Sequence, residues 1–217
     1  MAGAGGVCSH CTFQGNDLLK QRIITALVLL LILIPAIAAS SPVPFAALML
    51  VTMAAAAWEW ARLNGVRGFA SYLIAVCALV MCAGAWLMGW TTAALPWLWL
   101  VVGACWVLAA ALLLKGGVAG WPHIPQALRL AGGVVALWAV WLAIAQSKWI
   151  GVNFLMSVFA LVWVADIGAY FAGRAFGLRF TKNKLAPAIS PGKSWEGVWG
   201  GAIGVLILAV LWVLADR

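Results

Sequence analysis

The sequence predicts an all-α membrane protein, a polytopic transmembrane helical bundle of about seven spans with its N-terminus in the cytoplasm. Composition is the first observation: of 217 residues, 66% are hydrophobic and 8% are charged, whereas soluble domains have about 45–50% apolar and about 25% charged residues. The mean hydropathy of +1.09 also excludes disorder, which needs low hydrophobicity and high charge. The second observation is a set of long apolar stretches, and the third is the distribution of basic residues between them.

Seven apolar stretches are each long enough to cross a hydrocarbon core of about 30 Å as an α-helix. Helix is the expected conformation because lipid offers no hydrogen-bond partner to the backbone of an open strand. The stretches cover residues 23–40, 43–61, 70–89, 93–114, 130–147, 150–173 and 197–215. We expect residues 18–217 to form a single transmembrane domain, and the small, polar residues 1–17 to be a disordered or mis-started N-terminal extension.

The basic residues are distributed unevenly between the two sides of these spans. The connections on the N-terminal side hold 11 of the 13 Lys and Arg residues, and the other side holds Lys148 and Arg217. Because positively charged connections stay in the cytoplasm, the N-terminus and residues 174–196 are predicted to be cytoplasmic. The formal net charge of +8 also favours anionic partners such as phosphates or acidic lipids.

The acidic residue Asp166 lies deep inside a predicted span. It precedes Arg174 by eight residues, which places it about 12 Å from the helix end at 1.5 Å per residue. A carboxylate at this depth costs several kcal/mol unless it is paired, hydrated or metal-bound, and such residues usually mark a function. Tyr170 and Arg174 follow on the same helix face. The alternative is a buried aspartate that is satisfied by a polar group of a neighbouring helix.

The connection between the last two predicted spans is the segment richest in chemistry. Residues 174–193 include five basic residues and no acidic one. The run Ser-Pro-Gly-Lys-Ser at 190–194 supplies two hydroxyls and an ammonium group, which together with backbone N–H groups suit a phosphate. Ser194 is also a candidate N-cap for the following helix, whose N-terminus would attract an anion. The alternative is a connection that is basic for topology or that contacts anionic headgroups.

Small residues recur on both sides of this connection. The last span contains glycines at 197 and 201 and at 200 and 204, and the preceding span contains Gly168, Ala169, Ala172 and Gly173. Residues of this size at a spacing of four allow two helices to approach closely. The last two spans are therefore expected to pack tightly and to hold the basic connection at the membrane surface.

Several motifs resemble the bacterial phosphatidate cytidylyltransferase (CDP-diacylglycerol synthase) family. They are Asp-Ile-Gly-Ala-Tyr at 166–170, Lys-Leu-Ala-Pro at 184–187 and Ser-Pro-Gly-Lys-Ser-Trp-Glu-Gly at 190–197, with weaker similarity at 18–25 and 58–63. The resemblance implies transfer of a cytidylyl group from CTP to phosphatidate, giving CDP-diacylglycerol and pyrophosphate in phospholipid biosynthesis. It also implies Mg²⁺ as cofactor, and a multi-pass protein of the bacterial inner membrane whose active site faces the cytoplasm.

The same resemblance implies roles for individual residues. Asp166 and Lys193 would be catalytic, and Asp166 would also be a metal ligand. The substrate-binding residues would be Arg174, Lys182, Lys184, Ser190, Ser194 and Glu196. The implied partners are CTP, phosphatidate, membrane lipids and a second copy in a homodimer, with no nucleic acid.

The resemblance has one departure. The family signature near the C-terminus, Ser-x-x-Lys-Arg followed by Lys-Asp and His-Gly-Gly, is not found in the 217 residues. Residues 18–217 are therefore expected to be C-terminally incomplete relative to the family, with the main metal-binding aspartates in the missing segment. Two alternatives to an active enzyme stay open. One is a non-catalytic truncated fragment of the enzyme, and the other is an ion-coupled membrane transporter that uses Asp166 as its coupling carboxylate.

Overall fold

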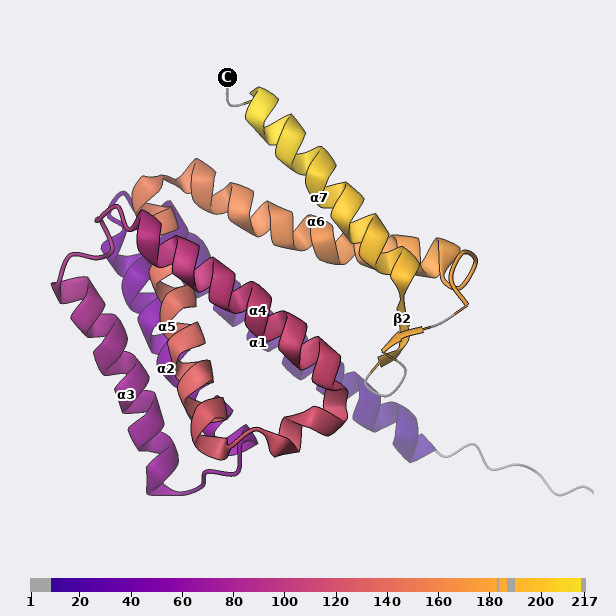
Figure 1. Ribbon diagram of the computed structural model, residues 1–217, viewed down its shortest axis with the longest axis horizontal. Helices are drawn as coiled ribbons and strands as arrows, with labels where there is room; N and C mark the ends of the chain where they lie inside the picture. The colour runs from indigo at the N-terminus through magenta and orange to yellow at the C-terminus, as the bar shows by residue number, and fades with distance from the viewer. Residues whose placement is uncertain (1–8, 183, 187–189, 216–217) are drawn as a thin grey trace, which may run out of the picture.

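The computed structural model describes residues 9–182, 184–186 and 190–215, which form seven α-helices, a short 3₁₀ turn and a β-hairpin (Figure 1). The elements are α1 (Ser9–Ala38), α2 (Val43–Leu63), α3 (Phe69–Leu87), α4 (Pro96–Gly120), η1 (Trp121–His123), α5 (Gln126–Ile150), α6 (Val152–Phe176), β1 (Lys184–Ala186), β2 (Ser190–Ser194) and α7 (Trp195–Ala215). The prediction of an all-α, polytopic helical architecture is confirmed.

Six of the described helices, α2 to α7, are long and apolar enough to cross a membrane. The apolar part of α1 is shorter and covers Ile23–Ala38. The helix itself begins at Ser9 and so includes part of the predicted N-terminal extension, and residues 1–8 lie outside the described part. An existing helix extends readily into a polar segment because each added residue contributes a further backbone hydrogen bond.

The core lies between α2, α3 and α5. Trp141 and Leu142 of α5 are fully buried against Ala46 of α2 and against Cys82 and Ala85 of α3. Small side chains on α2 and α3 leave room for the large indole ring between the helices. The indole N–H of Trp141 donates to the Ala46 carbonyl at 3.1 Å, so burial of this ring leaves no donor unsatisfied.

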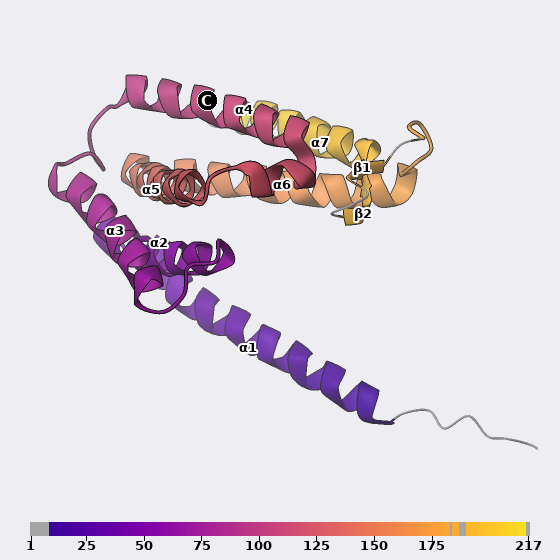
Figure 2. The ribbon, with the colours of Figure 1, turned by 60° about the horizontal axis from the view of Figure 1, so that its bottom comes forward.

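A buried lysine fastens α1 to this core. The ammonium group of Lys148, in the last turn of α5, donates to the Ile37 carbonyl and to the Ala39 carbonyl, the latter at 3.1 Å. The terminal carbonyls of a helix lack partners within the helix, and a cation stabilises that end. Figure 2 shows α1 projecting away from the other helices toward its N-terminus. Lys148, a basic residue on the side with few charges, therefore has a structural role.

Helices α6 and α7 form a close antiparallel pair beside this core. A Cβ atom added at Gly201 would lie 2.8 Å from the Ala165 carbonyl oxygen, and one added at Gly197 would lie 2.9 Å from that of Ala169. The two helices run together near the hairpin and separate toward their other ends (Figure 1). The close packing predicted from the small residues is confirmed.

The hairpin between α6 and α7 is the element that the sequence does not predict. Strands β1 and β2 pair antiparallel, with Lys184 opposite Ser194, and the register shifts once along the pair. Strands this short show no measurable alternation of polar and apolar residues, and Pro191 argues against a central strand. A two-stranded ribbon has only edges, where proline is tolerated.

We predict that Gly201→Val destabilises the protein by about 1–3 kcal/mol, because the added atoms would collide with the α6 backbone. Thermal unfolding in detergent measures this effect. Gly103→Ala in α4 is the matched control, since no heavy atom lies within 4 Å of a Cβ added there. Equal unfolding temperatures for the two variants would contradict close packing of α6 and α7.

Candidate active site at the hairpin between α6 and α7

The predicted site residues gather where α6 ends and α7 begins. Most lie on the last turn of α6, on the hairpin or on the first turn of α7, at the right of Figure 1. Asp166 lies farther along α6, within the span. The structure therefore brings together the basic residues of the connection and the Ser-Pro-Gly-Lys-Ser run, and it separates Asp166 from them along the helix axis.

Ser194 ends β2 and caps α7. Its hydroxyl oxygen accepts a hydrogen bond from the Gly197 N–H at 3.3 Å, and the residue is 7% exposed. Ser194 lies against the end of α6, because a Cβ atom added at Gly177 would be 3.4 Å from its hydroxyl oxygen. The prediction that Ser194 caps the helix is confirmed. Its predicted contact with substrate stays a prediction.

Glu196 is enclosed within the protein. The residue is 6% exposed, and its Oε1 atom accepts hydrogen bonds from the Phe180 N–H at 3.1 Å, the Thr181 N–H at 2.7 Å and the Thr181 hydroxyl at 2.9 Å. Its Oε2 atom is buried and has no hydrogen-bond partner among the described residues. The carboxylate thus faces the turn before β1 and not the surface of the hairpin. Thr181 is a partner that no sequence motif singles out.

Five basic side chains surround this junction and are exposed. They are Arg174, Arg179, Lys182, Lys184 and Lys193. Within the described part of the chain none of them makes an ion pair; Arg174 donates to the Tyr170 hydroxyl at 2.9 Å, and the Arg179 guanidinium lies 5.9 Å from the centre of the Phe176 ring. Unpaired cations at this density suit a ligand that carries several negative charges. Ser190, at the start of β2, is partly buried.

Asp166 is exposed and lies away from the contact between α6 and α7. Ala165 and Ala169 meet α7, whereas Asp166, Tyr170 and Arg174 follow one another along a different face of α6. No described polar group pairs with Asp166, so the interpretation of this residue as buried and satisfied by a neighbouring helix is wrong for the described chain.

The described residues contain no group of three His, Cys, Asp or Glu side chains that could hold a metal ion together. Mg²⁺ in phosphate-transferring sites commonly takes only one or two carboxylates and completes its shell with phosphate oxygens and water. A single exposed carboxylate on the α6 face that leads to Arg174 fits this requirement as one ligand. Asp166 is the acidic residue of this region with an accessible side chain.

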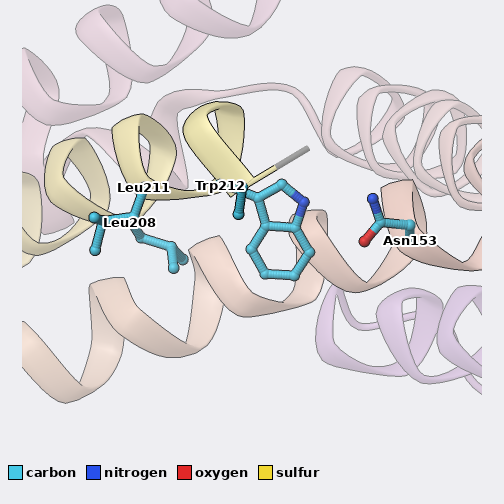
Figure 3. A pocket seen from close by; sticks show the side chains of 5 residues that line it. Asn153, Leu208, Leu211 and Trp212 are labelled. Atoms are coloured by element: carbon cyan, nitrogen blue, oxygen red, sulfur yellow. The ribbon is translucent and has the colours of Figure 1, made fainter. Parts of the chain in front are cut away.

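Two cavities lie elsewhere in the molecule. One, of about 320 Å³, lies between the start of α6 and the end of α7 and is lined by Asn153, Leu208, Leu211, Trp212 and Ala215 (Figure 3). The other, of about 700 Å³, lies where α3 connects to α4, beside the end of α5, and its lining includes Trp99 and Gln146. Neither contains a predicted site residue, so the cavities do not mark the site.

The architecture and the junction together define a class of protein: a multi-pass membrane protein with an exposed, unpaired basic surface on the hairpin between two tightly packed spans. Residues 20–216 match the model of the cytidylyltransferase family. The chain belongs to this family.

Individual relatives agree with this assignment. The chain is 40% identical over 198 residues to a phosphatidate cytidylyltransferase of Pseudomonas aeruginosa, an alignment that covers 85% of this chain and 66% of the relative. Phosphatidate cytidylyltransferases of Haemophilus influenzae (60% identical, 29% of this chain, 20% of the relative) and Brucella suis (50% identical, 24% and 18%) match over shorter segments. The chain thus spans just under two thirds of the Pseudomonas relative. No solved structure matches the chain.

We predict that Ser194→Ala lowers the free energy of unfolding by about 1 kcal/mol, because the substitution leaves the Gly197 N–H of α7 without its cap. Thermal or denaturant unfolding in detergent measures this loss, and Ser194→Asp should restore the capping acceptor. Ser157→Ala is the control, since the Ser157 hydroxyl donates only to the Phe154 carbonyl of its own helix. A Ser194→Ala protein as stable as this control would refute the capping role.

Proposed function

We propose that the protein transfers a cytidylyl group from CTP to phosphatidate, giving CDP-diacylglycerol and pyrophosphate at the cytoplasmic face of the bacterial inner membrane. The observation that carries this proposal is the cluster of exposed basic side chains without ion-pair partners, on the hairpin of a cytidylyltransferase-family chain. Both substrates are polyanions, one soluble and one embedded in lipid. Their reaction requires a cationic surface at the membrane boundary, where α6 ends and α7 begins.

In the proposed reaction an oxygen of the phosphatidate phosphate attacks the α-phosphorus of CTP. A new P–O bond forms, the bond from the α-phosphorus to the bridging oxygen breaks, and pyrophosphate leaves with that oxygen and its electron pair. Such transfers depend mainly on positioning and charge neutralisation. Lys193 would stabilise the charge that develops on the leaving pyrophosphate, with Lys182, Lys184 and the hydroxyl of Ser190 holding phosphate oxygens.

The lipid substrate would approach from the exposed face of α6. Arg174 stands in the last turn of this helix, where a basic side chain would meet the lipid headgroups, and its hydrogen bond to Tyr170 leaves further N–H donors of the guanidinium free. The contact with α7 is closed by glycines and leaves no room for a headgroup between the helices. We therefore assign the phosphatidate phosphate to Arg174 on the outer face of α6.

Asp166 would be a ligand of Mg²⁺, which supplies charge neutralisation to the phosphates of the substrates when it is bound. The carboxylate lies on the same face as Tyr170 and Arg174. In the absence of a described partner, an ionised Asp166 within a span would be costly, and a bound cation would offset that cost. A homodimer is a further proposal, which analytical ultracentrifugation in detergent would test.

We predict that the purified chain releases pyrophosphate from CTP in a phosphatidate-dependent and Mg²⁺-dependent reaction, and that Lys193→Ala lowers kcat/KM by about 10–100-fold through loss of one charged contact. Arg67→Ala removes an exposed basic residue between α2 and α3 and is the control. The Pseudomonas relative, assayed beside it, shows that the conditions support turnover. A silent chain beside an active relative would contradict turnover by this chain and favour the non-catalytic truncated fragment, and ion-dependent flux would favour the transporter.

We predict that Asp166→Asn lowers kcat by at least about 100-fold, because the amide removes the negative ligand while keeping the size of the side chain. The amide should raise the Mg²⁺ concentration needed for half-maximal rate in any residual activity. Full activity of Asp166→Asn would remove this residue from the site.

We predict that Arg174→Ala raises KM for phosphatidate by about 10-fold, while KM for CTP changes little, because the guanidinium contacts only the lipid substrate. Steady-state kinetics in mixed micelles with varied phosphatidate mole fraction measure both constants. If Arg174 only anchors the helix end at the interface, neither constant should change.

A further inference from the structure

Both oxygens of the Glu196 carboxylate are enclosed by the protein, which distinguishes Glu196 from the exposed residues of the candidate site. Its Oε1 atom accepts three hydrogen bonds from Phe180 and Thr181, and its Oε2 atom is buried. A carboxylate that binds a metal ion or orients a nucleotide needs an oxygen that the ligand can reach. Neither oxygen of Glu196 is in that position, whereas the five basic side chains around it are exposed.

The three hydrogen bonds hold a strained turn. Leu178, two residues before Phe180, has a φ of 63°, which a non-glycine residue adopts at a cost. A conformation of this kind persists where the surrounding contacts determine it. The turn is fixed on one side by the Arg179 N–H, which donates to the Phe176 carbonyl at 2.9 Å, and on the other side by the hydrogen bonds to Glu196.

A second contact fixes the chain three residues later. Lys184 of β1 pairs with Ser194 of β2. The chain from Thr181 to Lys184 is therefore attached at both ends to the short stretch 194–196, where α7 begins. Lys182 lies between the two attachments, and Lys193 lies next to one of them in the sequence. The two contacts together hold the backbone on both sides of Lys182 close to the residues that follow Lys193.

We infer that Glu196 is a positioning residue, whose buried carboxylate clamps the Phe180–Thr181 turn to the start of α7 and so presents Lys182 and Lys184 beside Lys193 for the triphosphate of CTP. This inference rests on the proposed function, and it replaces the predicted direct contact between Glu196 and substrate. A carboxylate suits the task because hydrogen bonds to an ionised acceptor are roughly twice as strong as those between neutral groups.

Two substitutions at position 196 separate a clamp from a ligand. Glu196→Gln keeps a carbonyl oxygen that can accept the same three hydrogen bonds, whereas Glu196→Ala removes the acceptor. We expect Glu196→Ala to raise KM for CTP by about 10-fold or more with a smaller change in kcat, since the misplaced lysines contact the nucleotide in the ground state as well. Glu196→Gln should recover KM to within about 3-fold of the wild type, with the same Mg²⁺ dependence.

Thr181→Val tests the clamp from its other side. This variant loses the hydroxyl that donates to Oε1 and keeps the Thr181 N–H bond, so it should raise KM for CTP less than Glu196→Ala does. Glu59→Ala is the matched control, because Glu59 is an exposed carboxylate near the end of α2. Glu59→Ala should leave both kinetic constants unchanged.

Hydrogen–deuterium exchange gives a readout that does not depend on activity. The backbone amides of Phe180 and Thr181 should be protected in the wild type and in Glu196→Gln, and should exchange faster in Glu196→Ala. If these two amides exchanged as slowly in Glu196→Ala as in the wild type, the clamp would be overturned even if the enzyme assay succeeded. If the wild type were inactive while the amide pattern held, the proposed function would fail and the clamp would stand as a structural contact.

The kinetic outcome that overturns the inference is equally specific. If Glu196→Gln were as inactive as Glu196→Ala, or required more Mg²⁺ than the wild type, the charge of Glu196 would act on the metal or substrate directly. Equal KM values for CTP in the wild type and in Glu196→Ala would show that the turn keeps its position without the carboxylate.

Discussion

The contact between α6 and α7 is the constraint on which the functional end of the molecule depends. Six glycines and three alanines allow the two backbones to meet, so that a methyl group added at Gly197 or Gly201 would overlap the carbonyl oxygens of α6. This proximity places the end of α6 directly against the start of α7. The connection between them then has to reverse direction within a small space, and it does so as a hairpin fixed at its base.

At the base of that hairpin, two polar residues each have two structural roles. Ser194 ends a strand and caps a helix, and Glu196 begins the helix while it holds the preceding turn. Both side chains are nearly buried, whereas the lysines and arginines beside them are exposed. The polar motif therefore divides into a buried part that determines shape and an exposed part that is available to polyanions. Lys148 shows the same division elsewhere, since its charge is used to cap α1.

Much of this arrangement could be predicted from residue types. The apolar stretches correspond to α2 to α7 with bounds that differ by at most six residues, because lipid leaves the backbone no alternative to helix. The spacing of small residues predicted the contact of α6 with α7, and Ser194 was a recognisable cap. The hairpin was missed because β1 and β2 are too short for any periodicity.

The sequence by itself determined the membrane architecture, the location of the basic connection and the family, since hydropathy, charge and local motifs are properties of the chain. Only the tertiary structure decided which of the acidic side chains are accessible. Asp166 and Glu196 both looked like candidates for ligand binding, yet one is exposed on an outer helix face and the other is enclosed by Phe180 and Thr181. Burial and hydrogen-bond partners depend on which segments meet in space, and residue order alone does not specify that.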